Sequence, residues 1–93
     1  MRLKEFEIEA IKSTIKEYDE NAELFLFGSR IDDKKRGGDI DVLVISNIIS
    51  LSEKIKIKIK LYNTIGERKI DIIITPAVNS AFLKYIYQQA VQI

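Results

Sequence analysis

The chain of 93 residues contains no cysteine and no histidine. The absence of cysteine excludes a disulfide framework, a zinc–thiolate site and a thiol nucleophile. Histidine is the commonest general base and transition-metal ligand, so any catalysis must rely on carboxylates, hydroxyls, lysine or arginine. A bound metal would then be a hard ion that prefers oxygen ligands, such as Mg²⁺ or Mn²⁺.

The sequence also lacks a long apolar run and an excess of charge of either sign. Lys and Arg number 15 and Asp and Glu 14, so the net charge of +1 gives no argument for nucleic-acid binding. The apolar runs are far shorter than a membrane span, and residues 1–10 carry no signal-peptide pattern. We therefore expect a cytoplasmic protein with one domain, residues 1–93, and a thin hydrophobic core.

The hydrophobic pattern predicts alternating helices and strands. Helical spacing runs over 4–18, 50–66 and 78–93, and short apolar runs of strand type cover 22–28, 39–46 and 68–76. This order predicts an α/β (α+β) fold, a small mixed sheet of three to four strands with helices packed on one face. The segment 29–38 holds a basic, glycine-containing loop, with a helical turn possible from Ser29 to Lys34.

One segment is ambiguous, because "KIKIKIK" (54–60) alternates as a half-exposed strand would. Ser50 and Glu53, however, match a capping box, and Gly66 is well placed to end a helix. Apolar residues also lie at helical spacing between these ends, at Leu51, Ile55, Ile59, Tyr62 and Ile65. The segment is therefore predicted to be a helix.

Three aspartates lie where buried strands normally carry apolar residues. Asp39 and Asp41 project from the same face of one strand, about 6.6 Å apart, where a divalent cation could bind between them. Asp71 is isolated near the start of another strand. If the two strands are neighbours, the three carboxylates could hold two metal ions about 3.5–4 Å apart. The alternatives are solvent-exposed edge charges or, for Asp71, an ion pair with Lys69 or Arg68.

Gly28, Ser29 and Arg30 follow a strand and offer a place for phosphate groups. Glycine allows close approach of the backbone, serine supplies a hydroxyl, and free amides at a helix start favour anions. Arg30 adds a permanent positive charge. The alternative is an ordinary turn followed by a solvated basic loop.

Together, Gly28-Ser29, Asp39-Ile40-Asp41 and the lone strand Asp71 resemble the nucleotidyltransferase superfamily typified by DNA polymerase beta. The Gly-Ser-Arg sequence and "GGDIDVLV" look like its smallest branch, the minimal nucleotidyltransferases. The resemblance covers about residues 22–76. It implies the nucleotidyltransferase fold, Mg²⁺ at Asp39, Asp41 and Asp71, and a nucleoside triphosphate, most simply ATP, on Gly28, Ser29 and Arg30.

The resemblance further implies transfer of a nucleoside monophosphate to a hydroxyl, with Asp71 as metal ligand and base for the attacking group. Many minimal nucleotidyltransferases are antitoxins of HEPN-domain toxins, and some add AMP to a toxin tyrosine. We therefore expect a HEPN toxin as partner. A non-catalytic module that neutralises its partner by covering it is the alternative, and transfer to a small molecule such as an aminoglycoside is a third.

The C-terminal segment has more apolar residues than one side of a small sheet requires. They are Phe82, Leu83, Ile86, Tyr87, Ala90, Val91 and Ile93. We expect residues 82–93 to help form a protein interface, with a toxin or with a second copy in a homo-oligomer. The alternative is that all these side chains belong to the core.

Overall fold

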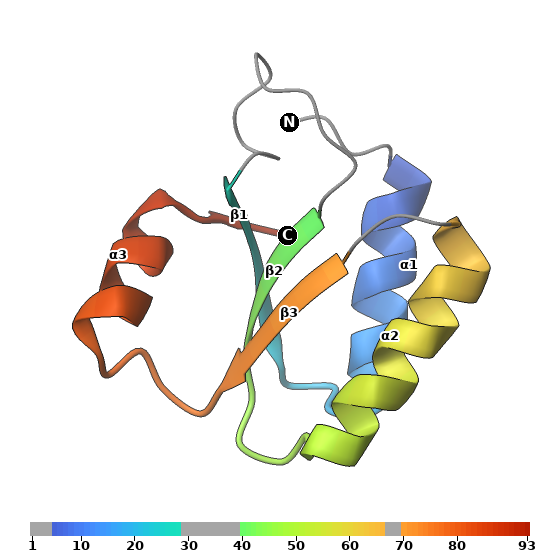
Figure 1. Ribbon diagram of the computed structural model, residues 1–93, viewed down its shortest axis with the longest axis horizontal. Coiled ribbons are helices and arrows are strands. Elements are labelled where there is room, and N and C mark those ends of the chain that lie inside the picture. Colours follow the sequence, from blue (N-terminus) through green and yellow to red (C-terminus); the bar gives the residue numbers. More distant parts are fainter. Residues whose placement is uncertain (1–4, 29–39, 67–69) are drawn as a thin grey trace.

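The computed structural model describes residues 5–28, 40–66 and 70–93. Their elements are α1 (Glu5–Lys16), β1 (Glu23–Phe27), β2 (Ile40–Ile45), α2 (Leu51–Ile65), β3 (Ile70–Thr75), α3 (Ala81–Gln89) and β4 (Val91–Gln92). The strands form one sheet in the order β3-β2-β1-β4 (Figure 1). Because β1 is antiparallel to β2 and β4 whereas β2 and β3 are parallel, the predicted mixed α+β sheet is confirmed.

Helices cover both faces of this sheet, and α1 and α2 share one of them (Figure 1). That face holds the larger core, where Ile11 and Ile15 of α1 and Ile57 and Leu61 of α2 are fully buried against the strands. The prediction of helices on one face is correct for α1 and α2. The third helix, α3, lies on the other face and buries Ile86 in a smaller cluster.

The helix predicted over the alternating segment is confirmed as α2. The capping box is complete, because the amide of Glu53 donates to Ser50 Oγ and the Ser50 amide donates to Glu53 Oε1. At its other end the amide of Gly66 donates to the Tyr62 carbonyl. These capping contacts favour a helix because they satisfy backbone groups at its ends within the segment itself. In a strand, the same groups would need a hydrogen-bond partner on a neighbouring strand.

The apolar residues that indicated α2 are nevertheless mostly not the ones that pack. Leu51, Ile55, Ile59 and Tyr62 are exposed and Ile65 is half-buried, whereas Ile57 and Leu61 are fully buried. A step of two residues turns a helix by about 200°, so Ile57 lies nearly opposite Ile55 and Ile59. The alternation therefore gives α2 two apolar sides, of which the sheet covers one.

The last predicted helix ends earlier than residue 93. Ala90 has an extended backbone, with φ −79° and ψ 151°, and ends α3. Val91 and Gln92 then form β4 beside β1, and the Ile93 amide donates to the Leu24 carbonyl. This pairing satisfies backbone groups on an edge of β1 that would otherwise be open, which explains why tertiary structure overrides the helical spacing here.

A buried hydrogen bond joins the two turns at the far end of the sheet from Gly28. Ser46 Oγ, just after β2, donates to Asp19 Oδ2 at 2.6 Å, and both residues are buried. The same hydroxyl accepts from the amides of Ile48 and Ile49. These contacts fix the path of the chain from β2 into α2. No helix among the described residues has the length and apolarity needed to cross a membrane.

Candidate active site

Asp41 and Asp71 lie opposite each other on neighbouring strands. They are partners in the parallel register of β2 and β3, and both side chains are half-buried. Partners on neighbouring strands are about 4.8 Å apart and project from the same face. The condition set from the sequence, that the two strands be neighbours, is therefore met.

The strand pattern explains which face the carboxylates occupy. Ile40 and Val42 on β2, and Ile70 and Ile72 on β3, are buried in the core beneath α1 and α2. Since side chains alternate along a strand, the aspartate between each pair must project to the side of α3. The apolar residues thus orient the carboxylate pair as well as stabilising the sheet.

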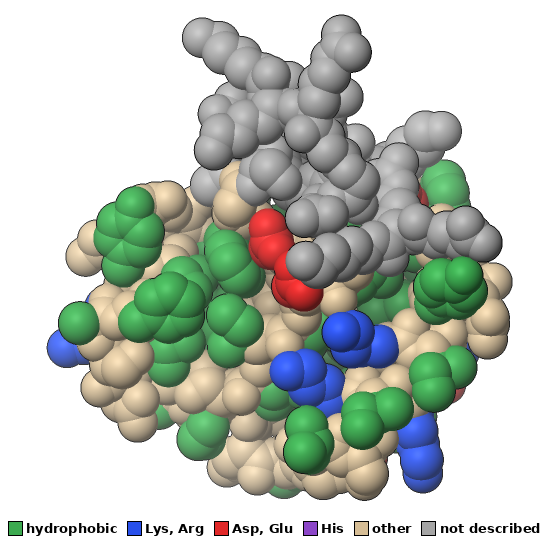
Figure 2. Space-filling view, in the orientation of Figure 1, with side chains coloured by type: hydrophobic (Ala, Val, Ile, Leu, Met, Phe, Trp, Pro, Cys, Tyr) green, Lys and Arg blue, Asp and Glu red, His purple; other side chains and the backbone are tan. Residues whose placement is uncertain are grey.

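A third strand, β1, ends beside the two aspartates, and Gly28 is the residue that follows it. The last residue of β1, Phe27, is the register partner of Asp41 in the antiparallel pair. Because β1 runs opposite to β2 and β3, its carboxyl end lies beside the amino ends of those strands. Acidic side chains reach the surface at this end of the sheet (Figure 2).

The geometry of Gly28 excludes any larger residue without local movement. Its φ is +74°, a conformation that L-residues rarely adopt. A Cβ added there would lie only 2.4 Å from Oδ2 of Asp41. Sequence reasoning assigned this glycine to phosphate binding and missed its contact with the carboxylate. No local signal in the sequence indicated this contact, because it depends on the pairing of β1 with β2.

The other predicted site residues, Ser29, Arg30 and Asp39, lie outside the described residues. Within the described ranges, no three Asp, Glu, His or Cys side chains gather closely enough to hold a metal. Asp41 and Asp71 contribute two of the three predicted carboxylates, and the roles assigned to all six site residues remain predictions.

The surface beside the pair is provided by α3, which packs on the same side of the sheet. Phe82 and Tyr85 expose 65% and 62% of their surface, and Tyr87 and Val91 are also exposed. Tyr87 contacts Phe25 of β1 edge to face, with ring centroids 5.1 Å apart. Apolar side chains therefore border the acidic ones (Figure 2). The alternative that all the apolar side chains named from the C-terminal sequence belong to the core is wrong for Phe82, Tyr87 and Val91.

Comparison with known families gives a match over most of the chain. The sequence model described as "Polymerase beta, Nucleotidyltransferase" matches residues 9–93. No curated protein matches this chain. The match covers the strands β1, β2 and β3, which position Gly28, Asp41 and Asp71. It confirms the resemblance to the superfamily, while assignment to the minimal branch remains a prediction. This chain is thus a member of the polymerase beta nucleotidyltransferase family, and nucleotidyl transfer is its class of activity.

Proposed function

We propose that this protein is a Mg²⁺-dependent nucleotidyltransferase that transfers AMP from ATP to a hydroxyl of a partner protein, as the antitoxin of a HEPN-domain toxin. The observation that carries the catalytic part is the in-register position of Asp41 and Asp71, at the end of the sheet where Gly28 ends β1. The toxin partner follows from the resemblance to minimal nucleotidyltransferases.

The described residues fit a divalent cation in the chemistry and placement of their donors. Two half-buried carboxylates side by side supply hard oxygen ligands and remain open to solvent on one side. Asp41 and Asp71 would hold Mg²⁺, with Asp39 as the third ligand. Bound there, the ion would supply charge stabilisation for the phosphate oxygens and a lower pKa for the attacking hydroxyl.

The protein's own residues then account for the remaining steps. Gly28, Ser29 and Arg30 would hold the triphosphate, and Asp71 would receive the acceptor's proton on a carboxylate oxygen. The acceptor oxygen forms a bond to the α-phosphorus, the bond from that phosphorus to the α–β bridging oxygen breaks, and pyrophosphate leaves. The exposed apolar residues of α3 offer the adjoining surface on which a protein acceptor would dock.

The proposal is tested by incubating the protein with Mg²⁺, α-labelled ATP and the protein encoded by the neighbouring gene. We expect label on the neighbouring protein, and we expect none from γ-labelled ATP, because the γ-phosphate leaves with pyrophosphate. Stoichiometric binding of the two proteins without transfer of label would favour the alternative, a non-catalytic antitoxin. The exposed apolar surface of α3 supports that alternative as well, because it could cover the partner without any transfer. Label from γ-labelled ATP would indicate phosphoryl transfer instead and would contradict the proposal.

Mg²⁺ is expected to stabilise the folded chain without any nucleotide. A ligand that binds only the native state raises the free energy of unfolding by about 1.4 kcal/mol when its concentration is tenfold above Kd. For a domain of this size each kcal/mol raises Tm by about 4–8 °C. Thermal unfolding across a Mg²⁺ titration measures the shift, and NaCl at matched ionic strength is the control. The shift should disappear in Asp71→Asn, and an unchanged Tm in the wild type would contradict a metal site at this pair.

A further inference from the structure

The outer side of α2 carries a continuous apolar stripe that the fold does not use. Leu51, Ile55, Ile59 and Tyr62 expose 74%, 53%, 57% and 51% of their surface. Their spacing of four, four and three residues places them along one side of the helix over about 16 Å. A row of hydrophobic side chains accordingly follows α2 in Figure 2. We call these four residues the α2 stripe.

Positive charge flanks the α2 stripe on both sides. At about 100° per residue, Lys54 and Lys58 lie along one side of it and Lys56 along the other. The acidic residue of α2, Glu53, is engaged in the capping box. Among the described residues, the lysine of α2 that forms an ion pair is Lys60, with Glu17 in the turn after α1, on the far side of the helix from the stripe.

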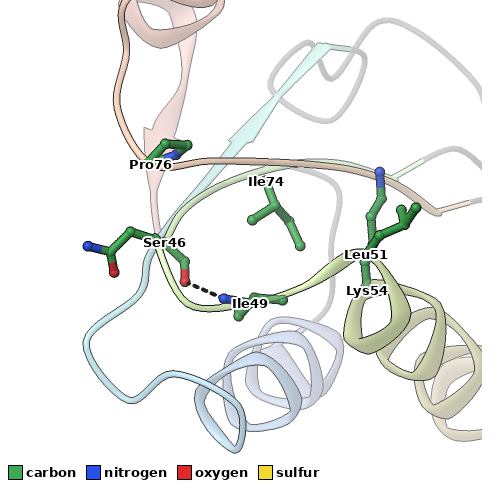
Figure 3. A pocket seen from close by; sticks show the side chains of 7 residues that line it. Ser46, Ile49, Leu51, Lys54, Ile74 and Pro76 are labelled. Carbon is green, nitrogen blue, oxygen red and sulfur yellow. Dashed lines mark hydrogen bonds between the residues drawn. The ribbon is translucent and has the colours of Figure 1, made fainter.

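A cavity of about 310 Å³ continues the stripe at the first turn of α2. Leu51 and Lys54 line it together with Ile74 of β3 and the neighbouring Pro76 (Figure 3). Because Leu51 belongs to both the stripe and the cavity, the two form one surface. The hollow between helix and strand offers room for an apolar side chain at one end of the row.

We propose that the α2 stripe docks an acidic amphipathic helix of a protein partner. Its apolar side would cover the stripe, one side chain would enter the cavity beside Leu51, and its Asp or Glu residues would face Lys54, Lys56 and Lys58. A second copy of this chain fits less well, since α2 against α2 brings lysines together. An anionic membrane matches the charge but has no side chain for the cavity. This surface is on the opposite face of the sheet from Asp41.

The test uses a fluorescent synthetic peptide of about 21 residues, with Leu at heptad positions a and d and Glu at e and g. Its matched control carries Lys in place of every Glu. By fluorescence anisotropy on the full chain, we expect the acidic peptide to bind about tenfold or more tightly than the basic one, with an affinity that falls as salt rises. Ile55→Ser with Ile59→Ser should weaken binding about tenfold, while Phe82→Ser on α3, also an exposed apolar residue, should not.

Tm values of the variants establish that each one folds, and the readout is independent of nucleotidyl transfer. The proposal would be overturned if the acidic and basic peptides bound equally tightly. It would also be overturned if the stripe variant and the Phe82 variant lost the same amount of affinity for the acidic peptide. The proposal would also be overturned if sedimentation equilibrium showed the wild-type protein to be a dimer and the double variant Ile55→Ser with Ile59→Ser to be a monomer. The same conclusion would follow if those substitutions removed binding to vesicles of phosphatidylglycerol and phosphatidylcholine while the acidic peptide did not bind.

Discussion

Replacing Asp41 with asparagine is expected to abolish nucleotidyl transfer while the protein remains folded. Asparagine has nearly the same shape but no negative charge, so it is a poor ligand for Mg²⁺. Losing several kcal/mol of transition-state stabilisation corresponds to a decrease of about three orders of magnitude or more in kcat. Transfer of label from α-labelled ATP measures the activity, and thermal unfolding verifies the fold.

The control for Asp41→Asn is Glu23→Gln, which removes an exposed carboxylate at the opposite end of β1. This variant should keep wild-type activity. Asp71→Asn should behave like Asp41→Asn, because the two carboxylates are register partners. Wild-type turnover in either aspartate variant would show that the catalytic assignment is wrong.

Gly28→Ala is expected to impair the site more than it impairs the fold. The added methyl group would lie 2.4 Å from Oδ2 of Asp41, so the carboxylate must move. A displacement of about 1 Å at a reacting centre can decrease the rate by about 100-fold. An alanine at φ +74° also costs about 1–3 kcal/mol of stability. We expect a lower Tm, a large loss of transfer and a weaker Mg²⁺-induced stabilisation.

The chain provides a matched control in Gly66, which ends α2. Its φ of +96° is also one that L-residues rarely adopt, so Gly66→Ala imposes backbone strain too, but among the described residues an added Cβ meets nothing within 4 Å. Gly66→Ala should therefore lower Tm and leave transfer and Mg²⁺ stabilisation unchanged in the folded protein. If both variants lost activity equally, the effect would come from strain alone and the contact with Asp41 would have no role.

The amino-acid sequence by itself determined the order of the six main helices and strands and the identity of the candidate catalytic groups. These features depend on local physics. Alternation along a strand sets the face of Asp41 relative to Ile40 and Val42, and the Ser50–Glu53 box starts α2 with contacts three residues apart. The ordered set of Gly28-Ser29, Asp39-Ile40-Asp41 and Asp71 was sufficient to predict the superfamily, which the family match confirms.

Only the tertiary structure decided which of these local features meet. The pairing of β2 with β3 places Asp41 opposite Asp71, 30 positions apart in sequence, and the antiparallel pairing of β1 with β2 brings Gly28 against Asp41. The choice between the two apolar sides of α2, and the change from helix to strand at Val91, depend on which surfaces the sheet leaves uncovered. Periodicity within a segment carries no information about distant partners, because burial and strand pairing are settled between segments rather than within them.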